Sequence, residues 1–231
     1  MFKSCIRKRM NPSIKSVVPA MAVVFLFFFI TGCAPTIYSV DLKYMASDAA
    51  PPIDAAGRKV IMTVAAFNDA RPGGEDLLIG RVTTPLRGST SVIPKNMNPS
   101  AAVSTIVKNI LVKSGHQVSV AMPAWNLKEN AIQKDWGKII IGGSIDELEV
   151  VCQNDFPIKT YDSRVKVTMV IADVQTGKII HQVSAASRNS LEHVYLSEVM
   201  LGQQISRAIT EAVEKAFEGD ALKESIKNAL K

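Results

Sequence analysis

Three acidic residues within one largely apolar stretch, Asp146, Glu147 and Glu149, have the types and spacing that could do acid–base chemistry. Two carboxyl groups can act as proton donor and acceptor when their surroundings hold one protonated and the other ionised. On a strand, Glu147 and Glu149 would share one face, and the simpler interpretation of that face is a solvated surface. A hydrolase acting on glycan or peptide would need one of these glutamates to meet another acid, such as Asp162.

The sequence lacks the strong catalytic signatures. It contains no G-x-S-x-G elbow, H-E-x-x-H helix, P-loop or C-x-x-C pair. The Gly142-Gly143-Ser144 run lacks the elbow spacing, and its position inside a strand pattern predicts a bulge or bend. His116, His181 and His193 share no metal-ligand spacing. We therefore expect a protein that is not an enzyme and that has no metal and no cofactor.

The positive charge is concentrated at the N-terminus. The chain has 27 Lys and Arg and 21 Asp and Glu, a formal net charge of +6. Residues 1–32 contain five of the cationic residues and no acidic ones, which leaves 22 cationic (27 minus 5) and 21 acidic residues in the rest of the chain. A nucleic-acid-binding protein is disfavoured, because such a protein would keep an excess of positive charge on its folded part.

Residues 1–32 have the layout of a secretory signal peptide. A cationic start is followed by a nearly continuous apolar run from Val17 to Ile30, then by Thr31, Gly32 and Cys33. The run is 14 residues long, whereas a helix needs about 20 residues to cross the hydrocarbon of a bilayer. It also contains a proline, so a retained transmembrane helix is the weaker interpretation.

The segment Ile30-Thr31-Gly32-Cys33 resembles the bacterial lipobox, in which small residues precede a cysteine that is acylated before the signal is removed. The resemblance implies that Cys33 becomes the mature N-terminus and carries palmitate-type acyl chains. Two or three chains exceed the single chain that gives only reversible membrane attachment. Ala34 stands where an inner-membrane retention signal would have Asp, which implies an outer-membrane protein facing the periplasm.

Removal of Cys5 with the signal and acylation of Cys33 would leave Cys152 without a disulfide partner. Cys152 follows an apolar run, which favours a buried small hydrophobic residue over a reactive thiol.

The rest of the chain divides into a tether and one domain. Residues 33–57 are rich in Ala, Pro, Ser and Asp and lack periodicity, which predicts a lipidated N-terminus followed by a flexible tether. Residues 58–231 are predicted to form a single α+β domain. Alternating apolar residues predict strands at 58–67, 77–83, 89–93, 117–120, 138–151, 159–173 and 178–187.

Two apolar stripes with helical spacing predict the main helices. The first helix begins after Asn98, a good N-cap residue followed by a proline, and ends at Gly115. The second covers residues 201–217, and a short final helix covers 222–230. This order predicts a mostly antiparallel sheet with helices packed on one face.

A loop after the first strand of the domain is the expected functional edge. Asp69, Arg71 and Glu75 lie in or beside this loop, which is rich in Gly and Pro, and the turn at residues 85–88 is the second candidate loop. Asp69 and Arg71 form either an ion pair that shapes the loop or a partner-binding site. Loops carried on a rigid scaffold commonly bind partners.

Several segments together resemble the YajG family of bacterial lipoproteins. They are the lipobox at Cys33, the helix end at 113–118, the strand at 139–151, and the C-terminal residues 205–213, 219–220 and 222–230. The last three follow the family's closing helix, acidic break and short terminal helix. The sequence departs from the family between residues 71 and 95, where it has a longer insertion, so no binding surface is carried over.

We therefore predict a non-catalytic, lipid-anchored envelope lipoprotein that binds or assembles another envelope component, either a protein or a lipid. One alternative is an accessory lipoprotein of a lipid or lipopolysaccharide transport system, which would have an apolar groove for acyl chains. The other is an envelope hydrolase with converging carboxylates.

Overall fold

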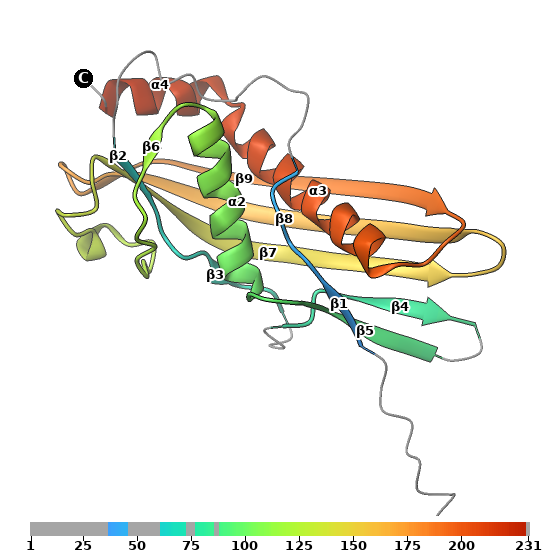
Figure 1. The fold of residues 1–231 in the computed structure, drawn as a ribbon. Helices are drawn as coiled ribbons and strands as arrows, with labels where there is room; N and C mark the ends of the chain where they lie inside the picture. The colour runs from blue at the N-terminus through green and yellow to red at the C-terminus, as the bar shows by residue number, and fades with distance from the viewer. Residues whose placement is uncertain (1–36, 46–60, 73–76, 86–87, 230–231) are drawn as a thin grey trace, which may run out of the picture. The chain divides into compact units, whose positions relative to one another are not determined.

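The structure, a computed structural model, describes residues 37–45, 61–72, 77–85 and 88–229 (Figure 1). These residues belong to one compact unit, Thr36–Lys231. The predicted signal peptide, Cys33 and Glu75 lie outside the described residues. In the described part of the chain, no helix is both long enough and apolar enough to cross a membrane.

The sheet is built on both edges of β7 (Ile139–Asn154). On one edge, β7 pairs antiparallel with β8 (Lys159–Asp173), and β8 pairs antiparallel with β9 (Lys178–His193). On the other edge, three short strands pair parallel to β7 one after another: β2 (Ile61–Val64), β3 (Asn68–Asp69) and β4 (Gly80–Thr84). The long strand β7 therefore pairs directly with β2, β3, β4 and β8, and β8 in turn carries β9.

Three further strands complete the sheet beyond β2 and β4. β5 (Gly88–Pro94) forms an antiparallel hairpin with β4, and β1 (Tyr38–Val40) pairs parallel to β5. β6 (Gln117–Val118) pairs parallel to β2. The α+β class is confirmed, but the prediction of a mostly antiparallel sheet is wrong, because the sheet is mixed.

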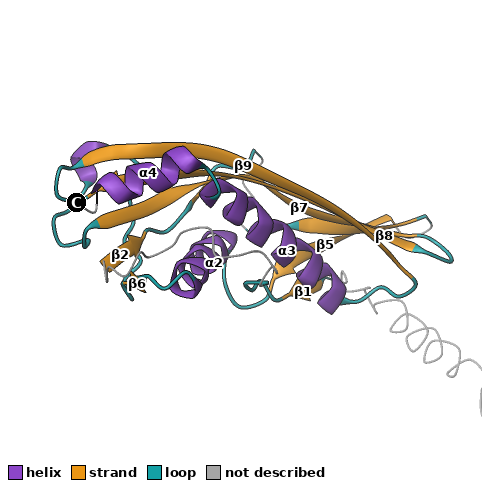
Figure 2. Ribbon diagram, turned by 90° about the horizontal axis from the view of Figure 1, so that it is seen from above, coloured by secondary structure: helices purple, strands orange, loops and turns teal. Residues whose placement is uncertain are grey.

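The described α-helices are α2 (Pro99–Lys113), α3 (Glu198–Phe217) and α4 (Asp220–Ala229), and all three lie on one face of the sheet (Figure 2). The predicted start of α2 is confirmed: Asn98 Oδ1 accepts a hydrogen bond of 2.8 Å from the backbone N–H of Ala101. Ser197 caps α3 in the same way. Capping satisfies backbone donors that have no partner within the helix.

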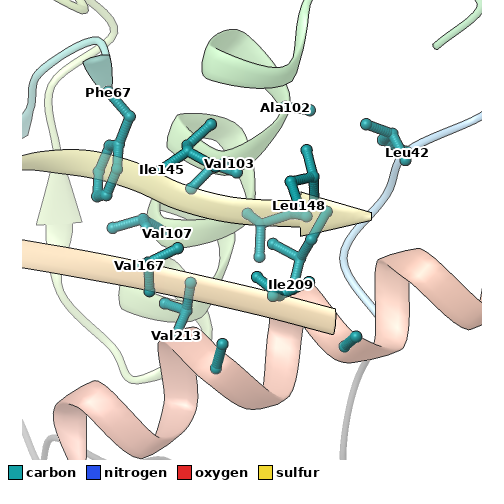
Figure 3. Close-up of a cluster of buried hydrophobic side chains, with 14 of the residues drawn as sticks. Leu42, Phe67, Ala102, Val103, Val107, Ile145, Leu148, Val167, Ile209 and Val213 are labelled. Carbon is teal, nitrogen blue, oxygen red and sulfur yellow. The ribbon is translucent and has the colours of Figure 1, made fainter. Parts of the chain in front are cut away.

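The main core fills the space between the helices and the sheet. Figure 3 shows Val103 and Val107 of α2, Ile145 of β7 and Ile209 of α3 among its members. A second, smaller core lies on the opposite face, where Trp125 and Trp136 cover part of β7 and β8. Residues 119–137, which include the short helix η3 (Glu129–Ala131), supply this cover.

Residues 38–45 belong to the fold, although their composition placed them in a flexible tether. Val40 and Leu42 are buried, at 1% and 7% exposure. The N–H groups of Lys43 and Met45 donate to Ser206 Oγ and Thr210 Oγ1 of α3, at 3.1 and 3.2 Å. The tether prediction is thus wrong for these residues. The segment is too short to show a periodic pattern in the sequence, and it is held in place by hydroxyl groups of α3, far along the chain.

The bulge predicted at Gly142 and Gly143 lies instead at Asp146, where the β7–β8 register shifts. Both glycines pair regularly with β8. They are needed for close packing, because a Cβ at 142 would lie 2.7 Å from Trp125 Cε3. A Cβ at 143 would lie 2.6 Å from Phe67 Cε1 and would overlap the carbonyl oxygen of Thr168.

We predict that Gly143→Ala lowers the free energy of unfolding by about 1–3 kcal/mol, because the added methyl overpacks the main core. Gly219→Ala is the matched control, since a Cβ there would meet nothing within 4 Å, and surface changes of this kind stay within about 0.5 kcal/mol. Chemical denaturation of the two variants measures both effects. Equal effects would contradict the packing explanation.

Candidate functional site

A groove of about 710 Å³ opens over a break in one edge of β7. β3 ends where Asp69 pairs with Ile145, and β4 begins where Gly80 pairs with Val150. The intervening residues of β7, 146–149, have no pairing strand on this edge among the described residues. The groove lies over this stretch, on the sheet face that is turned away from the helices.

The parity of the strands places charged side chains on the groove side. Leu148 and Val150 of β7 point into the main core, so Glu149 between them points to the opposite face. By the same alternation, Arg81 of β4 and Lys166 of β8 point to that face, since Val82, Val165 and Val167 are buried in the core. The bulge at Asp146 brings about this change of parity within β7.

Arg71 makes hydrogen bonds across the break in the edge of β7. Its Nη1 donates to the carbonyl oxygens of Leu78, at 2.7 Å, and of Leu148, at 3.4 Å. Its Nε and Nη2 donate to the two carboxylate oxygens of Asp69, at 2.8 and 2.6 Å. A guanidinium group can make such a forked, charge-assisted pair while still reaching main-chain acceptors. Arg71 thus joins the end of β3, the approach to β4 and the unpaired stretch of β7.

The electrostatics of the pair agree with this geometry. The side-chain hydrogen bonds from Arg71 hold the pKa of Asp69 below its ordinary value. Burial acts in the opposite direction, whereas the backbone hydrogen bond from Arg71 and its positive charge lower the pKa further. The two side chains are only 14% and 19% exposed. Of the two interpretations that the sequence left open, the ion pair that shapes the loop is what the structure shows.

The remaining charged residues of the groove differ in the partners that they have within the protein. Arg81 Nη1 lies 2.8 Å from Glu149 Oε1 in an exposed ion pair. Asp146 accepts hydrogen bonds from Ser144 Oγ, at 2.7 Å, and Thr168 Oγ1, at 2.6 Å. Glu147 lies opposite Lys166 in the β7–β8 register. The groove therefore presents both signs of charge along one wall.

The acids that a hydrolase would need are not gathered in the groove. Glu147 and Glu149 line it, whereas Asp162 pairs with Val151 further along β8 and is not among the lining residues. Glu149 is engaged by Arg81. Among the described residues, no group of three or more His, Cys, Asp or Glu side chains could hold a metal ion.

Cys152 is buried in the main core, as predicted, and is a free thiol. Burial raises its pKa to about 11. Since the thiolate is the nucleophile, this environment favours an inert residue. His181 and His193 lie near opposite ends of β9, and His116 is buried after α2.

The structure thus brings Asp69 and Arg71 together with Asp146, Glu147 and Glu149, which the sequence suggested for a different reason. Arg81, Lys166 and the β5 residues Ser89 and Ser91 also line the groove and were not recognised from the sequence. Their strands were predicted correctly, so the missing information was which strand pairs with which. No local pattern identifies β4 as the neighbour of β7.

Comparisons with known proteins relate this fold to solved structures. Neither a scan against protein-family models nor a search of curated proteins finds a match. The chain is similar to protein XCC0632 from Xanthomonas campestris, of the family DUF330, with 10% identity, a TM-score of 0.52, and coverage of 85% of this chain and 100% of that one. This likeness shows a shared fold.

Two further solved structures match more distantly. Lipoprotein GNA1162 from Neisseria meningitidis has 11% identity and a TM-score of 0.36, over 66% of this chain and 96% of that one. The PelC dodecamer from Paraburkholderia phytofirmans has 15% identity and a TM-score of 0.35, over 74% and 93%. Scores this low support no argument about this chain, and the resemblance to the YajG family stays a prediction.

We predict that Arg71→Ala lowers the free energy of unfolding by about 1–3 kcal/mol, because the Leu78 and Leu148 carbonyls and the Asp69 carboxylate lose their donor. Arg81→Ala is the matched control: its ion pair is exposed, and such pairs contribute about 0–1 kcal/mol. Denaturant titration gives both values. A larger effect for Arg81 than for Arg71 would show that Arg71 does not hold the β7 edge together.

Proposed function

We propose that this protein is a non-catalytic lipoprotein, anchored by acyl chains on Cys33, that binds another envelope protein through the groove over β7. The observation that carries the proposal is the groove itself. Arg71 and Asp69 hold its frame by contacts within the protein, while Glu147 and Lys166 line an open wall. A rigid frame with exposed charges is typical of a surface that recognises a partner by electrostatic complementarity.

The lining of the groove favours a polypeptide over a lipid chain. An acyl chain in the groove would remove water from Lys166 and from the Arg81–Glu149 ion pair, and taking charged groups out of water is costly even when they are paired. A protein surface can instead pair with these charges and with the Ser89 and Ser91 hydroxyls. An accessory role in lipid transport would therefore use another surface.

The distribution of acids likewise favours binding over hydrolysis. Acid–base catalysis on a glycan needs two carboxyl groups facing each other across the scissile bond. In this groove Glu149 is paired with Arg81, and Asp146 accepts hydrogen bonds from two hydroxyls. We infer that Glu149 and Asp146 hold neighbouring side chains of the groove in place and that the acids of the groove bind a partner.

The site of attachment is the outer membrane, with the domain facing the periplasm. This part of the proposal is based on the sequence around Cys33, where Ala34 stands in place of a retention signal. The membrane is then one partner of the protein and the groove-bound protein is the other. Nucleic acid is not a partner, since residues 33–231 carry almost no net charge.

We predict that Cys33→Ser abolishes labelling by radioactive palmitate and releases the protein from washed membranes. The reason is that the thiol is the acceptor of the first acyl group. Cys152→Ser is the control, because this thiol is buried and outside the lipobox. Palmitate incorporation and membrane fractionation are measured together. Firm membrane retention of the Cys33 variant would favour a transmembrane signal.

We further predict that a photoreactive amino acid at Ser91, in the groove, captures a discrete envelope protein in living cells. The matched control is the same amino acid at Glu224, an exposed position of α4 on the helix side of the sheet. Lys166→Glu reduces the Ser91 adduct, because it reverses a charge that lines the groove. Adducts are identified by mass spectrometry.

The nature of the adduct separates the three functions. A protein adduct that depends on Lys166 supports the proposal. A lipid or lipopolysaccharide adduct at Ser91 indicates transport, and a glycan fragment indicates hydrolysis. Equal capture at Ser91 and Glu224 shows that the groove is not the binding surface.

A further inference from the structure

Exposed apolar side chains gather where the long strands β7 and β9 end and β8 begins. We call this surface the apolar tip. It consists of two residues of the β7–β8 turn, the end of β9 and the start of α3: Phe156, Ile158, Leu191, Val194, Tyr195 and Val199. Phe156 is 95% exposed, Tyr195 72% and Val199 67%. Large apolar residues that cluster on a surface in this way mark an interaction site.

The segment that carries Tyr195 is held in place by hydrogen bonds. The Tyr161 hydroxyl, which lies against the main core, donates to the Tyr195 carbonyl oxygen at 2.8 Å and accepts from the Ser197 N–H at 3.3 Å. The Tyr195 N–H donates to His193 Nδ1 at 3.1 Å. A fixed backbone therefore presents the apolar side chains to the surroundings.

Two charged groups beside the tip are already bound to main-chain atoms. Lys159 Nζ donates to the Asp155 carbonyl oxygen at 2.7 Å. Glu198 Oε1 accepts from the Ser39 N–H at 2.7 Å. These contacts partly satisfy a cation and an anion that would otherwise require full hydration next to the apolar side chains.

The same Glu198 contact shows where the N-terminal chain joins the domain. Glu198 begins α3 and precedes Val199 of the tip, so β1 enters the fold beside the tip. Ile37, the first described residue, is 49% exposed. Cys33 is four residues earlier, which is at most about 14 Å of chain even when fully extended. Acyl chains on Cys33 would hold a bilayer close to this side of the domain.

We propose that the apolar tip binds the surface of the lipid bilayer in which Cys33 is anchored. This inference rests on the proposed function, since it needs the acyl anchor. Phe156 and Tyr195 enter the interface between headgroups and acyl chains, where aromatic rings are favoured. The domain is then held by the anchor and by the tip. No tip residue lines the groove, so the tip and the groove are separate surfaces.

The test uses the full-length lipidated protein in vesicles of phosphatidylethanolamine and phosphatidylglycerol that contain brominated acyl chains, which quench nearby tryptophan. Phe156→Trp reports on the tip. Val120→Trp is the matched control, because Val120 is 87% exposed and follows β6 beside β2, far from the tip. The native Trp125 and Trp136 are buried in both variants and give the same background.

If the tip contacts the bilayer, the tryptophan introduced by Phe156→Trp loses emission and shifts to shorter wavelength in brominated vesicles, and the Val120→Trp variant does not change. Equal quenching of the two variants, or none, in an acylated preparation overturns the inference and leaves the proposed function in place. Palmitate labelling of the same preparations is the separate readout for the anchor. A preparation from cells that shows no acylation overturns the proposed function and this inference with it.

Discussion

A backbone acceptor inside a sheet must find a donor, and β7 meets this requirement at its broken edge through Arg71. Between the end of β3 and the start of β4, the Leu148 carbonyl has no described strand beside it, and the Arg71 guanidinium donates to it from the loop. The same guanidinium binds Leu78 just before β4. The break can therefore exist without leaving this carbonyl unpaired. The groove lies over this break, and beyond it the β4–β5 hairpin is placed by the pairing of β4 with β7.

Local features of the fold could be predicted from the sequence. The α2 cap at Asn98, the turn ending at Gly177 and the stripe of α3 each follow from a few neighbouring residues. Pairing between distant segments could not be predicted, because β2, β3 and β4 are too short to carry a pattern that selects β7 over another partner. The parallel pairings and the role of residues 38–45 were missed for the same reason.

In the candidate site, too, the local features could be predicted from the sequence and the contacts between distant segments could not. Asp69 and Arg71 were found because Asp and Arg two residues apart in a Gly-rich loop suggest an ion pair. The reach of Arg71 to Leu148 follows from the bulge at Asp146, which also turns Glu147 and Glu149 toward the groove. A bulge adds one residue to one strand and is determined by packing on both faces. Gly142 and Gly143, where the sequence pattern predicts a bulge, instead allow Trp125 and Phe67 to approach the sheet.

The attachment to α3 of the segment that follows β1 has a consequence for the order in which the chain can fold. Lys43 and Met45 bind Ser206 and Thr210, which are 163 and 165 positions later in the sequence. During synthesis, these two residues therefore have no hydroxyl partner until almost the whole polypeptide has left the ribosome. Contacts of such long sequence separation slow folding. A chain that completes its fold only when its last long helix has been synthesised remains unfolded longer than one whose contacts are local.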